Sequence, residues 1–216
     1  MGETMDRGDL KPFHPQALAL KNIRLLGIGN FIGYCLVIGC VYSNWLGYLS
    51  DSAYIYKSFG LTAALIGYCY ISQSLSSVIG SFALKRLLRA LTIDAIIGFA
   101  LLGNLAVCVL LIVLGHMGIG WFLSLVTLMA FTNGMLLPAN ISSAMSAAVH
   151  EDQTLGGTAS GLVGFIQIGG AALGTWIVSE LPHRTASLGT VLSGFMAVAA
   201  LVHLYRLSTK RRSLPT

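Results

Sequence analysis

The stretch GGTASGLVGFIQIGGAALGTW, residues 156–176, decides the fold of this chain. It holds seven glycines among 21 residues and no charged residue. Such glycine density is typical of a phosphate-binding loop or a linker, but a phosphate loop needs a preceding strand and nearby charge, and this stretch has neither. In lipid an unsatisfied backbone group costs several kcal/mol, whereas an interior glycine costs up to ~1 kcal/mol against alanine. We therefore predict a transmembrane helix.

Two glycine pairs with GxxxG spacing lie in this predicted helix. The first pair is Gly157 and Gly161, and the second pair is Gly170 and Gly174. Small residues at this spacing let two helices approach closely in a membrane. We expect both pairs to be helix-packing surfaces.

The composition of the whole chain also indicates a membrane protein. Of its 216 residues 55% are hydrophobic and 10% are charged, whereas soluble domains carry about 25% charged residues. The formal charge is +5, but the basic residues lie in small clusters between long apolar runs. This placement is typical of membrane proteins and does not favour a nucleic-acid partner.

Six apolar segments are long enough to cross a hydrocarbon core of ~30 Å as helices. They are residues 25–46, 61–84, 95–115, 121–149, 157–178 and 188–205. None contains Asp, Glu, Lys or Arg. Because backbone groups in lipid must bond within their own segment, the segments are predicted to be helical. The expected fold is an all-α integral membrane protein with six transmembrane helices.

The basic residues predict how the chain is oriented in the membrane. Eleven of the 13 Lys and Arg residues fall on one alternating set of connections, which includes both ends of the chain. Excess basic charge marks the cytoplasmic side. We expect a polar cytoplasmic tail at 1–24 with no signal peptide, a six-helix domain at 25–205 and a basic cytoplasmic tail at 206–216. The predicted location is the cell (inner) membrane, with several spans and both termini cytoplasmic.

Several polar side chains lie inside the predicted spans. Such side chains face a bundle interior or an aqueous path, or else bond to a neighbouring helix. Asn44 and Asn104 belong to this set, and Pro138 interrupts one helix between two asparagines. The residues expected to bind substrate are Tyr34, Gln73, Asn133, Asn140 and Gln167. A further stripe of Ser72, Ser76 and Gly80 fits either helix packing or a cavity wall.

No set of residues for catalysis, cofactor binding or metal binding emerges from the sequence. The four cysteines lie in apolar runs as packing residues, and the cluster of His150, Glu151 and Asp152 is typical of a solvated turn. We expect no enzyme activity, no cofactor and no metal. The spans also lack the carboxylate that proton-driven carriers generally need, and the nearest one, Asp94, is expected at a helix start, where it suits the helix dipole.

Three stretches resemble a known family. The segment after the sixth helix of major facilitators is resembled by GETM at 2–5. The end of their seventh helix and the start of the eighth are resembled by YLSDSAYIYKSFGLTAALIGYCY at 48–70. The start of their eleventh helix is resembled by GGTASGLVGFIQIGGAALG at 156–174. The chain is similar to the C-terminal half of drug:proton antiporters of the Bcr/CflA type. One departure is that Ser52 precedes Ala53 where the family commonly has Ser-Pro.

The resemblance implies one six-helix half of a multidrug efflux carrier of the major facilitator superfamily, with an amphipathic small molecule bound between two halves. The partner would be the missing N-terminal half, so the chain is expected to be truncated and inactive alone. The antiporter signatures of the first six helices match no position in this chain. An alternative is a six-helix transporter that pairs with a second copy of itself. A membrane-embedded enzyme has little support, because no nucleophile and base lie together.

Overall fold

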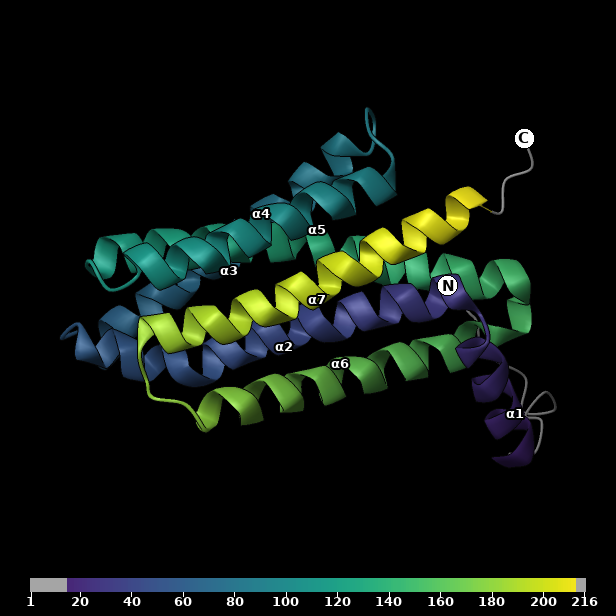
Figure 1. The fold of residues 1–216 in the computed structure, drawn as a ribbon, viewed down its shortest axis with the longest axis horizontal. Helices are drawn as coiled ribbons and strands as arrows, with labels where there is room; N and C mark the ends of the chain where they lie inside the picture. Colours follow the sequence, from purple (N-terminus) through teal and green to yellow (C-terminus); the bar gives the residue numbers. More distant parts are fainter. Residues whose placement is uncertain (1–14, 213–216) are drawn as a thin grey trace, which may run out of the picture.

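The computed structural model describes residues 15–212, and their side chains from 20 to 209. Over this range the chain is entirely helical (Figure 1). The elements are α1 (Pro15–Leu26), α2 (Gly29–Ser58), α3 (Ala63–Leu87), α4 (Ile93–Leu114), α5 (Ile119–Glu151), the short 3-10 helix η2 (Gln153–Leu155), α6 (Gly156–Ser179) and α7 (Thr185–Arg212). The glycine-rich stretch that opens the sequence argument is therefore a helix, as predicted.

Short polar turns separate the long helices. Thr62 and Thr92 cap α3 and α4, because each hydroxyl accepts a hydrogen bond from a backbone N–H three residues later. Gly60 ends the turn after α2 with φ +81°, a conformation that a residue with a Cβ rarely adopts.

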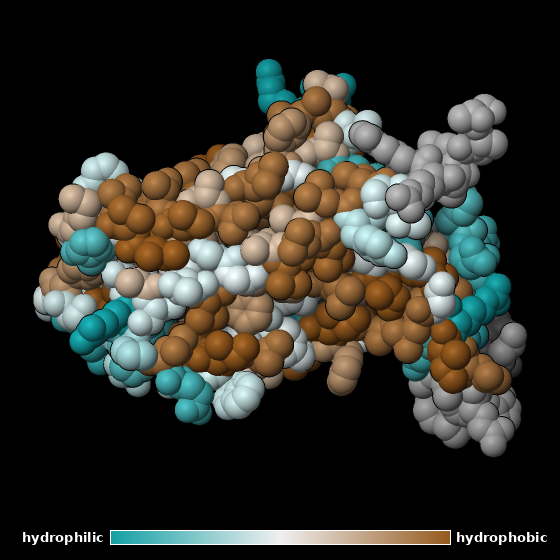
Figure 2. Space-filling view, in the orientation of Figure 1, coloured by the Kyte–Doolittle hydropathy of each residue, from teal (hydrophilic) through white to brown (hydrophobic). Residues whose placement is uncertain are grey.

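Five of the described helices are long and apolar enough to cross a membrane by length and composition, namely α2, α4, α5, α6 (with η2) and α7. They coincide with five of the six predicted spans. The sixth, α3, has the necessary length but is not among the five, because Gln73 and five serines lower its hydropathy. In Figure 2, apolar residues cover the length of the helices and hydrophilic residues gather at the two ends.

Three connections predicted to be loops or tails are partly helical. The segment 47–60 was expected outside the membrane, yet α2 continues through it to Ser58. Residues 15–24 belong to α1 rather than to an extended tail, and α7 runs through Arg212. The family-like stretch at 2–5 lies outside the described residues. Pro138 does not interrupt α5, which is continuous around it.

Helices α2 and α5 occupy the centre of the bundle. Helix α2 packs against α5, α6 and α7, whereas α5 packs against α2, α3 and α4, and α4 also packs against α7. Figure 1 shows α7, α2 and α6 lying side by side along the bundle. Helix α1 extends from one end, where it contacts α6 and α2.

Small residues allow the closest helix contacts. A Cβ on Gly170 or Gly174 would collide with the backbone of α2 at Gly39 or Ser43, so the second glycine pair packs as predicted. The Ser43 hydroxyl donates to the Gly170 carbonyl oxygen at 2.7 Å across this contact. The first pair differs, because a Cβ on Gly157 or Gly161 would meet no described atom within 4 Å. The packing predicted for Gly157 and Gly161 is therefore not made by the described part of this chain.

The α3–α5 contact is built in the same way. A Cβ on Gly80 would collide with the Phe131 carbonyl, and one on Gly134 with the Ser77 carbonyl. The Ser81 hydroxyl donates to the Gly134 carbonyl oxygen at 2.9 Å. The sequence allowed either helix packing or a cavity wall for the small residues of this segment, and Gly80 serves helix packing.

Candidate functional site

A buried amide network joins four helices near the centre of the bundle. Asn104 Nδ2 donates to Thr132 Oγ1 at 2.8 Å and to Asn133 Oδ1 at 3.0 Å. Cys108 Sγ donates to Asn104 Oδ1 at 3.4 Å, and Asn44 Nδ2 donates to Cys108 Sγ at 3.4 Å. Asn44 also reaches α7 through the Leu192 carbonyl oxygen. Asn44 and Asn104 therefore bond neighbouring helices, which is one of the two roles the sequence allows.

Three of the five predicted substrate residues carry a buried polar atom with no hydrogen-bond partner among the described residues. These atoms are Gln73 Oε1, Asn133 Nδ2 and Asn140 Oδ1, and each side chain is no more than 3% exposed. Buried polar groups in folded proteins are almost always bonded to protein, water or ligand. These three amides therefore retain hydrogen-bonding capacity inside the bundle.

Asn133 lines a cavity of about 280 Å³ between α2, α3 and α5. Trp45, Ser74, Ser77 and Leu137 also line it. One indole, two hydroxyls and one amide suit a largely apolar ligand with a few hydrogen-bonding groups. The volume lies just below the range of about 300–1,000 Å³ that is typical of pockets for drug-sized ligands.

Gln73 lies in a different environment, among aromatic side chains. Its Nε2 donates to the Tyr56 hydroxyl at 2.8 Å, and that hydroxyl lies 3.1 Å from the Tyr48 hydroxyl. The Phe122 ring packs edge-on against Tyr56 at 5.3 Å between centroids. Gln167, by contrast, is half-buried on α6 and does not line the Asn133 cavity. The structure therefore does not bring the five predicted substrate residues together.

Tyr34 belongs to a buried ionic cluster that joins α2, α4 and α7. Arg206 Nη2 donates to Asp94 Oδ1 at 2.5 Å, and the Tyr34 hydroxyl donates to the same oxygen at 2.8 Å. The guanidinium carbon lies 3.9 Å from the Tyr34 ring centroid, a cation–π contact. His203 Nε2 lies 3.0 Å from the Asp94 backbone oxygen, and its Nδ1 lies 3.3 Å from Arg206 Nη2. These contacts fit a neutral imidazole that donates from Nε2.

This cluster was not predicted from the sequence. The sequence placed Arg206 in a solvated tail, but the side chain is 5% exposed. Gly33 makes room for it, since a Cβ there would lie 2.9 Å from Arg206 Cδ. The spacing of His203 and Arg206, three residues apart on an otherwise apolar helix, is the signal that points to a shared buried face.

A further carboxylate of low exposure lies in the part of α2 that extends beyond the predicted span at 25–46. Asp51 lies inside α2, is 3% exposed and pairs with His183 Nδ1 from the turn between α6 and α7. The Tyr54 ring stacks on His183 at 4.4 Å between centroids. The pair therefore fastens the turn between α6 and α7 to α2.

Of the three residues predicted to form a solvated turn, His150 and Glu151 are exposed but are the last two residues of α5, which ends only at its C-cap residue Asp152. Asp152 accepts a hydrogen bond from the Thr154 backbone N–H at 2.8 Å and forms an ion pair with Arg24 at 2.9 Å. These contacts, the Thr154 hydrogen bond first, lower the pKa of Asp152. No group of three His, Cys, Asp or Glu side chains suited to a metal ion occurs within the described residues.

The fold and these sites define an all-helical protein whose long apolar helices are those of a membrane-embedded chain. No protein-family model, curated protein or solved structure matches the chain. The class of membrane protein proposed below therefore rests on the helices and side chains of the chain itself.

Proposed function

We propose that this chain forms one six-helix half of a major facilitator carrier that exports amphipathic small molecules. In this proposal α3 is also a membrane helix. A second six-helix half completes the substrate site, and the two halves rock to expose it alternately to each side of the membrane. The family resemblance of 48–70 and 156–174 favours a multidrug efflux carrier of the Bcr/CflA type, which couples export to proton entry when complete.

The arrangement of the helices carries the proposal. If α2, α3 and α4 are exchanged with α5, α6 and α7, each major helix contact becomes another contact of the same bundle. The α2–α6 contact becomes α5–α3, the α2–α7 contact becomes α5–α4, and the α2–α5 and α4–α7 contacts map onto themselves. With three helices in each unit, the two units run in opposite directions across the bundle. Such inverted three-helix repeats build each half of a major facilitator.

The buried amides support a transport role. Asn133 and Asn140 are seven residues apart on one face of α5, and each carries an unpaired polar atom. Helix α5 is one of the two central helices, so a substrate site built by this half would draw on these amides. A membrane protein that used its amides only for helix packing would pair them more fully.

An open helix face supports a partner. Helix α6 is the least buried of the five candidate spans, because only 17% of the residues in its apolar 18-residue stretch are buried in the bundle. A Cβ on Gly157 or Gly161 would meet no atom of the described residues within 4 Å, and Phe165, Ile168 and Trp176 are exposed on the same helix. A glycine pair left open on an apolar helix is suited to close packing with a further transmembrane helix.

The proposal is tested by drug efflux from an efflux-deficient bacterium. We expect the chain alone to leave ethidium accumulation unchanged. Joined to an N-terminal six-helix half of a Bcr/CflA-type carrier, it should lower accumulation until an uncoupler is added. Asn133→Ala in the joined protein should weaken this efflux, whereas Gln153→Ala, which removes an exposed amide before α6, should not. Uncoupler-sensitive efflux by the chain alone would contradict the need for a second half.

The open glycine pair also favours a second candidate, a transporter made of two copies of this chain. Gly161→Cys should then form a disulfide between copies in native membranes, after the four native cysteines are replaced by alanine. Thr190→Cys is the matched control, because Thr190 is an exposed residue of α7. If neither variant cross-links, the two-copy arrangement through this face is wrong.

A further inference from the structure

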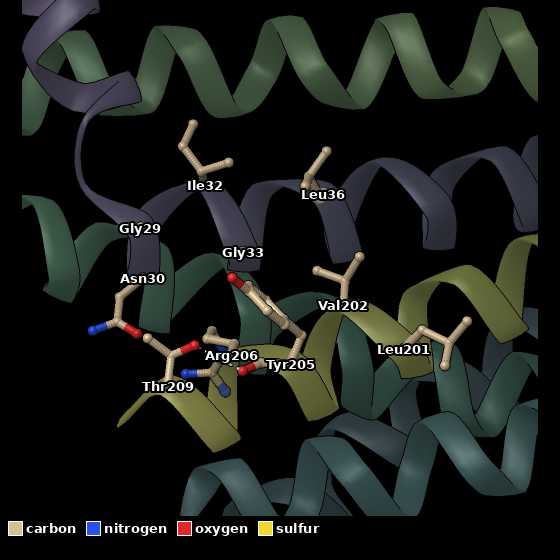
Figure 3. A pocket seen from close by; sticks show the side chains of 10 residues that line it. All are labelled: Gly29, Asn30, Ile32, Gly33, Leu36, Leu201, Val202, Tyr205, Arg206 and Thr209. Atoms are coloured by element: carbon tan, nitrogen blue, oxygen red, sulfur yellow. Dashed lines mark hydrogen bonds between the residues drawn. The ribbon is translucent and has the colours of Figure 1, made fainter. Parts of the chain in front are cut away.

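A surface groove of about 650 Å³ lies between α2 and α7 (Figure 3). The side chains of Leu36, Leu201 and Val202 line one end, and those of Asn30 and Thr209 lie at the other. The apolar end opens onto the apolar surface of the bundle, since Leu36 is 50% and Leu201 66% exposed. A groove that is polar at one end and apolar at the other matches an amphiphilic molecule.

The polar end contains a buried cation with an unused donor. Arg206 lines the groove beside Asn30 and Thr209. Its Nη2 is occupied by Asp94 and His203, but its Nε is buried and has no partner among the described residues. A buried guanidinium N–H without an acceptor is unfavourable unless a ligand or water supplies one.

The N-terminus of α2 opens at the same place. Gly29, the first residue of this 30-residue helix, lines the groove. The residue before it, Ile28, makes no capping side-chain bond, and the first turn contains no acidic residue. The first N–H groups of a helix have no partner inside the helix and carry partial positive charge. Phosphate groups bind readily at such positions.

We infer that this groove binds an anionic membrane lipid. The phosphate contacts the helix start at Gly29 and Asn30 together with Arg206 Nε, and one acyl chain lies along Leu36 and Leu201. Asp94 balances the charge of Arg206, so the net attraction comes from the helix start. This site does not depend on the proposed transport function.

The test measures the melting temperature of the lipid-depleted chain in detergent by tryptophan fluorescence. A lipid that binds only the folded chain raises its melting temperature. We expect dioleoylphosphatidylglycerol to raise it by about 5 °C more than dioleoylphosphatidylcholine, which has the same acyl chains but no net charge. Inorganic phosphate alone should leave it unchanged, because the acyl chain contributes to binding.

Two variants locate the site. Asn30→Asp places a carboxylate at the helix start, where it replaces the phosphate and stabilises the helix, so the variant folds but loses the phosphatidylglycerol response. Gln153→Glu makes the same charge change outside the groove and should respond like the wild type. Leu36→Trp fills the apolar end and should also reduce the response. Equal shifts with both lipids, a full shift with inorganic phosphate, or an undiminished response of Asn30→Asp would each overturn the inference.

Discussion

The two GxxxG pairs of α6 have the same sequence pattern but different surroundings. Gly170 and Gly174 touch the α2 backbone, whereas Gly157 and Gly161 touch nothing in the described chain. The difference continues beyond the glycines. The turn after the packed end of α6 is fastened to α2 by His183 and the buried Asp51, whereas the turn before its open end is tied to α1 by an exposed Arg24–Asp152 ion pair and by a hydrogen bond from Lys21 Nζ to the Thr154 carbonyl oxygen. The same GxxxG spacing therefore forms a helix contact inside the bundle at one end of α6 and an open surface at the other end.

The largest expected effect is at the packed end. Gly174→Leu forces a side chain into the Ser43 carbonyl, so α6 must move away from α2. We expect a loss of about 3 kcal/mol or more of unfolding free energy, measured by denaturation in detergent. Gly174→Ala should show a smaller loss in the same direction. An unchanged stability for Gly174→Leu would mean that this contact does not hold the helices together.

The next effect is at the turn that follows the packed end. His183→Ala leaves the Asp51 carboxylate buried without its partner, and we expect a loss of about 1–3 kcal/mol. Asp51→Asn removes the charge as well, so the double variant should be more stable than the sum of the two single effects predicts. Strictly additive effects in this cycle would show that the pair contributes no coupling.

A smaller effect is expected at the ion pair that precedes the open end. Arg24→Gln should shift the melting temperature by about 1 °C or less at neutral pH, because exposed ion pairs contribute little. The pKa of Asp152 is lowered mainly by the Thr154 N–H. Its stabilisation is therefore fully present above the ordinary aspartate pKa and is lost as the pH falls through the lowered value. Asp152→Asn should remove this part of the acid sensitivity, and an unaltered acid profile would contradict it.

The smallest effect on the chain alone is expected at the open pair. A Cβ at Gly161 would meet no described atom within 4 Å, so the melting temperature of Gly161→Leu should match that of the wild type or rise slightly, because leucine favours a helix. The same change should abolish efflux when the second half is present, since it blocks close packing. A large loss of stability in the isolated chain would show that this face is already occupied.

The positions of the helices could be predicted from the sequence because lipid leaves few alternatives for a long apolar segment. Five predicted spans overlap apolar helices, and the largest shift is at the C-terminal end of α2, which lies at Ser58 rather than at residue 46. This extension was missed because the apolar run ends there and the segment that follows contains the charged Asp51. Its partner His183 lies 132 positions away, and pairing at that distance leaves no local pattern.

The candidate site was harder to predict for the same reason. Arg206 and Asp94 are 112 positions apart, and each alone was interpreted as a residue at the membrane edge. The amides were found by residue type, but their partners were not, since Asn104 and Asn133 meet only after α4 and α5 pack. The sequence also does not distinguish Gly174 from Gly161, because the GxxxG spacing predicts a contact surface but does not identify the helix that packs against it.

The unequal packing of α6 also defines a mechanical property. A helix held by backbone contact near one end and only by side-chain packing near the other, here at Ala159 and Val163, would tilt about the tighter contact, which here is that of Gly174 with Ser43. Gly157 lies 17 residues from that point, about 25 Å along the helix. A tilt of about 10° therefore displaces the open end by about 4 Å, roughly the width of one side chain, while the turn fastened by Asp51 and His183 hardly moves.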